Sequence, residues 1–152
     1  KDFLMKRYIY IVVILVGLLI VESCNKLPMN GKLDGKWQLK TIIKNSQKKN
    51  QEDSGIFWSF QLKLCQITYM RGLFDGASNI ANTRFLYKND SLFIFNIYLN
   101  FRNRDSLIVT PTTIFEEAGI TGSQEGFKVI TLNKKNMLLE NGNKKLLFRK
   151  LE

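Results

Sequence analysis

Residues 35–44 read Gly-Lys-Trp-Gln-Leu-Lys-Thr-Ile-Ile-Lys, and the alternation within them decides the fold class. Apolar or β-branched residues occupy every second position from Trp37 to Ile43, and polar residues separate them except at Ile42. Successive side chains of a strand point to opposite faces of the sheet. The pattern therefore predicts a strand with one buried and one solvated face.

The same two-residue period returns along the rest of the chain. Asn89-Asp90 separates two β-rich runs, which is a strong hairpin signal. Polar loops are expected at 45–55 and 71–83. The predicted strands are 58–65 (with an extension to 70 left open), 84–88, 91–99, 106–110, 127–132, 137–140 and 145–151. We therefore expect an all-β fold, an antiparallel barrel of about eight strands, because closure removes exposed strand edges.

One short helix is predicted between the strands, at residues 110–119. Thr110 can cap the free N–H groups, Pro111 suits the first helical position, and Gly119 suits a left-handed end. The helix is expected to have about two turns.

The N-terminal segment is predicted to be an export signal. Lys6 and Arg7 precede an uncharged apolar run, Tyr8 to Val21, which is shorter than the roughly 20 residues that cross a bilayer. Met5 would be the natural start of such a signal. An uncleaved membrane anchor and a buried core helix are the alternatives.

The apolar run ends in Val21-Glu22-Ser23-Cys24, which resembles a bacterial lipobox. The resemblance implies cleavage before Cys24 and a lipid on its sulfur, so that the membrane is a partner through this lipid. We therefore expect a signal peptide at 1–23, a lipidated tether at 24–32 and a barrel domain at 33–152. The protein would be exported and anchored in the cell envelope.

Composition excludes several kinds of chemistry. The 152 residues include no histidine, which excludes Ser-His and Cys-His catalysis and His-ligated zinc or haem. The two cysteines cannot hold a zinc or iron–sulfur centre alone, and Cys65 is expected to be a small residue on the polar face of its strand. Most acidic residues fall in predicted turns, so no inward carboxylate pair is evident. We expect no enzymatic activity, no cofactor and no metal site.

The distribution of the excess basic residues predicts a solvated surface rather than a nucleic-acid site. Lys and Arg number 23 against 13 Asp and Glu, a net charge of +10. The lysine pairs 48–49, 134–135 and 144–145 fall in separate predicted loops, so the charge is dispersed. Attraction to anionic membrane surfaces is plausible but unspecific.

A family resemblance enters with Gly35-Lys36-Trp37 at the start of the first strand and Arg149 near the end of the last. This arrangement resembles lipocalins, and the wider pattern over about 33–151 looks like the small lipocalin-like lipoproteins of Gram-negative anaerobes. The resemblance implies a lipocalin-like barrel in which Arg149 packs across Trp37 and closes the base. It also implies an outer-membrane lipoprotein. An arginine over an indole ring contributes roughly 0.5–2 kcal/mol. The alternative is that Trp37 is only a core residue.

Two functions remain open. The first is binding of a small apolar or amphipathic ligand against inward aromatic side chains. The second is a filled barrel whose surface binds an envelope protein or polysaccharide. A packed core is the alternative role of the candidate ligand-lining residues, which are Trp58, Phe60, Phe93, Phe95 and Tyr98.

Overall fold

The alternating stretch at the start of the domain forms the first strand, β1 (Gly35–Lys44), with Trp37 and Leu39 completely buried. A computed structural model describes residues 7, 29–74, 76, 78–101, 104–109 and 113–151. Its other strands are β2 (Gln47–Asn50), β3 (Ile56–Gln61), β4 (Leu64–Tyr69), β5 (Ile80–Lys88), β6 (Ser91–Phe101), β7 (Arg104–Leu107), β8 (Glu125–Leu132), β9 (Asn136–Asn141) and β10 (Lys144–Lys150).

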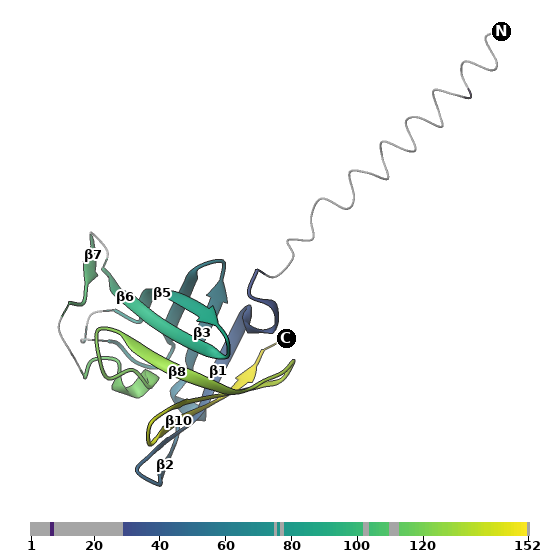
Figure 1. The fold of residues 1–152 in the computed structure, drawn as a ribbon. Helices are drawn as coiled ribbons and strands as arrows, with labels where there is room; N and C mark the ends of the chain where they lie inside the picture. The colour runs from purple at the N-terminus through teal and green to yellow at the C-terminus, as the bar shows by residue number, and fades with distance from the viewer. Residues whose placement is uncertain are drawn as a thin grey trace.

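Eight of these strands close into an antiparallel barrel, which confirms the predicted fold class (Figure 1). Their order around the barrel is β1, β3, β4, β5, β6, β8, β9 and β10, and β10 pairs back onto β1. Strand β2 forms a hairpin with the end of β1 and is not one of the eight barrel strands, and β7 pairs with the end of β6. Short 3-10 turns lie at η2 (Gly31–Leu33), η3 (Glu52–Ser54) and η4 (Glu116–Ala118).

The seam between the first and last strands closes the barrel. Trp37 lies opposite Lys150 and Leu39 lies opposite Phe148, and the register shifts between Leu39 and Thr41. The N–H of Leu151 donates to the carbonyl of Lys36 at 2.8 Å. The last strand of the chain therefore pairs with one edge of the first strand.

Aromatic rings fill the interior near Trp58. Its ring centroid lies 5.2 Å from that of Phe148, 6.1 Å from that of Phe127 and 6.2 Å from that of Phe60. Burying each large apolar side chain contributes roughly 1.5–3 kcal/mol. This cluster is thus a main source of stability for the barrel.

The predicted strand at 58–65 was wrong in one respect, because it contains a hairpin. Strand β3 ends at Gln61, and Leu62 and Lys63 form the turn into β4. Leu62 has a φ of 56°, which is the left-handed region. The turn reverses the phase of the alternation, so Cys65 is completely buried rather than on the polar face.

Two predicted loops also contain ordered structure. Residues 45–55 include β2 and η3, and strand β5 begins at Ile80 within the predicted loop 71–83. The hairpin at Asn89-Asp90 is confirmed, with φ values of 50° and 53°. Both Asn and Asp tolerate this conformation, which a tight hairpin turn requires.

The predicted two-turn helix is replaced by the 3-10 turn η4. Gly119 ends it with a φ of 88°, the left-handed end expected of this glycine. The proposed cap at Thr110 and first turn at Pro111 lie outside the described residues. The predicted export signal, apart from Arg7, also lies outside the described residues, and so does Cys24. No helix within the described ranges is long and apolar enough to cross a membrane.

Candidate functional site

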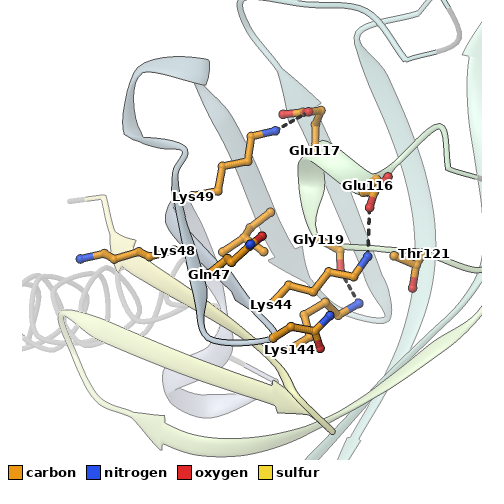
Figure 2. Close-up of a pocket in the computed structure, with 11 residues that line it drawn as sticks. Lys44, Gln47, Lys48, Lys49, Glu116, Glu117, Gly119, Thr121 and Lys144 are labelled. Carbon is orange, nitrogen blue, oxygen red and sulfur yellow. Dashed lines mark hydrogen bonds and ion pairs between the residues drawn. The ribbon is translucent and has the colours of Figure 1, made fainter.

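A pocket of about 610 Å³ opens beside the β1–β2 hairpin, at the end of β1 away from Gly35. Figure 2 shows the residues that line it. One side is the β1–β2 hairpin, and the other is η4 with the segment that follows it. We call it the rim pocket. Its lining is Ile42, Lys44, Asn45, Gln47, Lys48, Lys49, Glu116, Glu117, Gly119, Thr121 and Lys144.

Two ion pairs connect the hairpin to η4 across the rim pocket. Lys44 Nζ lies 3.1 Å from Glu116 Oε1, and Lys49 Nζ lies 2.6 Å from Glu117 Oε1, as Figure 2 shows. Gln51 Nε2 also donates to Glu117 Oε2 at 2.9 Å. The hydrogen bonds from Gln51 and Lys49 lower the pKa of the Glu117 carboxyl. Glu117 is therefore held as an anion, facing the basic hairpin.

A buried charged network supports one wall of the rim pocket. Lys144 Nζ donates to the carbonyl of Gly119 at 2.8 Å and to Glu125 Oε1, and both charged side chains are less than 9% exposed. Glu125 also accepts from the N–H of Thr121 and from Asn141 Nδ2, each at 2.9 Å. Removal of one partner from such a pair costs about 3–5 kcal/mol. The network therefore fixes the segment after η4 against β8 and β10.

The charges of the rim pocket suit an anionic group. Four lysines line it: Lys44 and Lys49 pair with the lining glutamates, Lys144 pairs with the buried Glu125, and Lys48 has no ion pair among the described residues. The pairs at Lys44 and Lys49 are about half exposed, and exposed pairs contribute only about 0–1 kcal/mol. A ligand carboxylate or phosphate can therefore compete with Glu116 for Lys44. Ile42 adds an apolar contact at the barrel side.

The barrel interior contains two of the predicted ligand-lining residues, Trp58 and Phe60. Both are at most 2% exposed and pack against other core rings. Trp58 Nε1 is buried and has no hydrogen-bond partner among the described residues. The rings of Phe93 and Phe95 stack on the outer face, with their centroids 5.7 Å apart, and Tyr98 is half-buried on the same face. The structure thus does not bring these five residues together.

The outward position of Phe93 and Phe95 has a simple cause. Leu92 and Ile94 occupy the interior face of β6, and they are completely buried. Asn96, with a φ of 51°, then interrupts the alternation, so that Ile97 and Leu99 are inside and Tyr98 is outside. Because both faces of this strand are apolar, its sequence did not show which face would be inside.

At the closed base, Lys150 rather than Arg149 covers the tryptophan. Lys150 Nζ lies 5.0 Å from the centroid of the Trp37 ring. Arg149 points outward and donates to Gln38 Oε1 at 3.0 Å. Trp37 Nε1 donates to the carbonyl of Leu33 at 2.8 Å. The expected arginine contact is therefore made by its neighbour, whose side chain lies on the other face of β10.

Gly35 has a structural role beside this contact. Its φ is 119°, and a Cβ at this position would lie 2.8 Å from Lys150 Cε. Only glycine adopts this conformation readily, and its missing side chain leaves room for the lysine. Gly35, Trp37 and Lys150 thus form one packed corner of the barrel.

Catalytic and metal-binding arrangements are not apparent in the part of the chain that the structure describes. Burial raises the pKa of the Cys65 thiol well above its usual value, which disfavours the reactive thiolate. Within the same residues, no group of three or more Cys, Asp or Glu is placed to hold a metal ion. The arrangement at the rim can bind and orient a charged molecule.

Sequence reasoning missed the rim pocket. The sequence predicts dispersed surface charge for Lys48, Lys49 and Lys144, and it places Glu116 and Glu117 on the predicted short helix. The pocket depends on the contact between β2 and η4 across the barrel mouth. Lys49 of β2 and Glu117 of η4, which form this contact, are 68 residues apart in the chain. The two adjacent glutamates before Gly119 were the available signal, and it is weak.

Comparison with known proteins places the chain beside a group of bacterial barrels. Residues 18–151 match the model of a family described as the lipocalin-like domain. A lipocalin-like protein from Bacteroides uniformis has 24% identity and a TM-score of 0.59, over 80% of this chain and 100% of that one. A protein described as uncharacterised from Bacteroides eggerthii has 23% identity and a TM-score of 0.52, over 78% of this chain and 99% of that one. No curated protein gives a significant match.

Proposed function

The chain belongs to the family of lipocalin-like domains, and from this we propose that it binds a small amphipathic ligand with an anionic group in the rim pocket. The family is generally a binding fold and not an enzymatic one. We further propose that the protein is exported, lipidated on Cys24 and anchored in the outer membrane of a Gram-negative bacterium. The barrel would then hold its ligand at the envelope.

The observation that carries the ligand proposal is the pair of exposed lysines on the hairpin side of the rim pocket: Lys44 has only an exposed ion pair, and Lys48 has none among the described residues. A volume of about 610 Å³ falls within the usual 300–1,000 Å³ of small-molecule sites. An anionic group on the ligand would replace Glu116 at Lys44, while the remainder lies along Ile42 and the hairpin backbone. The exposed ion pairs that close the pocket are weak enough to open for this exchange.

The position of the ligand differs from the one that the aromatic pattern suggests. Trp37, Trp58 and Phe60 are at most 2% exposed, and their rings contact other core side chains. A ligand in the interior would have to displace these contacts, at a cost of roughly 3–5 kcal/mol for each large ring. Binding at the rim has no such cost.

Fluorescence titration with a dansyl-labelled undecanoate tests the proposal. We expect saturable binding to a chain of residues 29–152, and weaker binding of the methyl ester, which lacks the charge. The double variant Lys44→Gln/Lys48→Gln should bind the acid about thirtyfold more weakly, since each of the two lost charge–charge contacts contributes about 1 kcal/mol. Both substituted residues are on the exposed hairpin, so folding should be retained.

The matched control is Lys134→Gln/Lys135→Gln, which removes two exposed lysines from the β8–β9 turn at the other end. This variant should bind the acid like the wild type. Equal affinity of the rim variant and the wild type would overturn the rim site. If Trp58→Phe alone abolished binding, the ligand would instead lie in the barrel and contact the unpartnered Trp58 Nε1.

The filled interior also favours a second function, that of an interaction protein with no small ligand. In that case neither the acid nor the ester would bind, and the barrel surface would contact an envelope protein or polysaccharide. A chain that binds neither probe would therefore direct attention to its outer surface.

A further inference from the structure

The outer face of β4, β5, β6 and β8 carries large apolar side chains that remain in solvent. Leu64, Leu86, Phe93 and Ile130 are between 39% and 59% exposed, as is Leu62 in the adjoining turn. Soluble proteins rarely expose contiguous apolar side chains over several strands unless a partner covers them. We call this face, together with the cations described next, the basic-apolar wall.

Strand register makes these side chains neighbours. Leu86 pairs with Phe93, and Phe93 pairs with Gly126 on the far side. One step along, Leu64 pairs with Arg84, and Arg84 pairs with Phe95, whose ring stacks on Phe93. Paired residues on one face are about 4.5–5.5 Å apart at Cβ. The leucine and phenylalanine side chains therefore form a continuous surface across β4, β5 and β6, and Ile130 lies apart from it on β8, beyond Lys128.

Three cations lie at the edge of this apolar surface, and a fourth, Arg84, lies within it between Leu64 and Phe95. Lys63 lies in the β3–β4 turn, Arg84 and Lys88 are on β5, and Lys128 is on β8; all four are exposed. None of them has an ion-pair partner among the described residues. Strands β4, β5 and β6 contain no Asp or Glu, and the Glu125 of β8 is buried. The wall thus combines apolar side chains with four cations, and its acidic neighbours are Asp90 in the β5–β6 turn and Glu140, which lies opposite Lys128.

The chain enters the barrel beside this wall. Asn30 Nδ2 donates to the carbonyl of Leu62 at 2.9 Å, and the preceding Met29 is 60% exposed. Asn30 and Gly31 also border a surface pocket together with Ile130. Whatever holds the segment before Met29 at a membrane would therefore hold the basic-apolar wall close to it as well.

We infer that the basic-apolar wall docks on an anionic lipid surface. Its leucine and phenylalanine side chains enter the interfacial region, and the lysine and arginine heads reach the lipid phosphates. A second copy of the chain fits this wall less well, because pairing the same faces would place cations opposite cations. The net charge of +10 favours an anionic surface over a neutral one.

Vesicle co-sedimentation tests this inference on a chain of residues 29–152, which contains the whole described core and lacks the predicted lipid. We expect binding to vesicles of equal parts phosphatidylcholine and phosphatidylglycerol, and at least about tenfold weaker binding to phosphatidylcholine alone. The variant Leu86→Ser/Phe93→Ser should lose about tenfold or more in partitioning. Its control, Met70→Ser/Val109→Ser, removes two side chains that are 62% and 73% exposed at the other end and should bind normally.

The charge arm uses Lys88→Gln/Lys128→Gln, which should lower partitioning about fivefold per lysine. Its control, Lys36→Gln/Arg71→Gln, removes two exposed cations off the wall and should have little effect. Equal sedimentation with both vesicle types, or no loss in the Leu86→Ser/Phe93→Ser variant, would overturn the inference. The inference would also be overturned if the chain bound no vesicles and formed a dimer in solution that the Leu86→Ser/Phe93→Ser variant dissociates. None of the rim-pocket residues is altered in these variants, so ligand binding can fail or succeed independently.

Discussion

At the scale of single residues, the sequence identified the segment that covers Trp37 but not the residue, which is Lys150 rather than Arg149. The start of the first strand and the end of the last identified the two segments that meet at the base. Neighbouring residues of a strand point to opposite faces, so an error of one position exchanges inside for outside. Phe148 occupies the interior, and Lys150 shares its face of β10. The segment was predictable, but the residue in contact depended on the register.

Substitution at the base separates these roles. Trp37→Ala should lower the free energy of unfolding by about 3–5 kcal/mol, because it removes a completely buried ring and its hydrogen bond to Leu33. Arg149→Ala should change it by no more than about 0.5 kcal/mol, since the arginine is exposed. Urea denaturation of residues 29–152 measures both. A large loss for Arg149→Ala would show that the arginine, and not Lys150, stabilises the closure.

At the scale of elements, the turns explain what was found and what was missed. Asn89-Asp90 has the residues that tight hairpin turns require, so the β5–β6 hairpin was predictable. The β3–β4 turn has the same length but uses Leu62 and Lys63, neither of which is typical of a turn. Alternation therefore seemed to continue, and the phase of β4 was predicted incorrectly. Likewise, the contacts between η4 and the β1–β2 hairpin are tertiary and leave no local signal.

The strained turn gives a test of this explanation. Leu62→Gly should raise the free energy of unfolding by up to about 1 kcal/mol, because a left-handed φ costs a leucine roughly 1–2 kcal/mol and glycine very little. Leu64→Gly is the matched control, since it removes a leucine of similar exposure from an extended strand. That control should be destabilising by about 1 kcal/mol. If both variants lost stability equally, the turn at Leu62 would not be strained.

At the scale of the whole molecule, the number of strands and the short turns were sufficient to predict a closed barrel. Periodicity counts strands well, and closure follows from the cost of exposed edges. What periodicity cannot give is the packing of the interior or the meeting of distant loops. The rim pocket and the basic-apolar wall both arise from such long-range placement. They also lie on different parts of the barrel, so the proposed ligand site and the proposed membrane contact use separate surfaces.

The proposed anchor is a property of the whole chain and is tested in cells. Radiolabelled palmitate should enter the wild-type protein and not Cys24→Ala. The other cysteine, Cys65, is completely buried and should not carry lipid, so Cys65→Ala serves as the control that keeps its label. Equal labelling of the wild type and Cys24→Ala would refute the lipoprotein proposal.

The pairing of β1 with β10 has a consequence for biosynthesis. During synthesis or translocation, the first strand emerges early, but one of its partners is the last segment to appear. Until then, β1 keeps an unpaired edge and the ring of strands stays open. The nascent chain is therefore expected to remain a substrate for chaperones until nearly its full length is available. Cells that express a chain truncated before β10 should accumulate aggregated or degraded fragments rather than smaller folded domains.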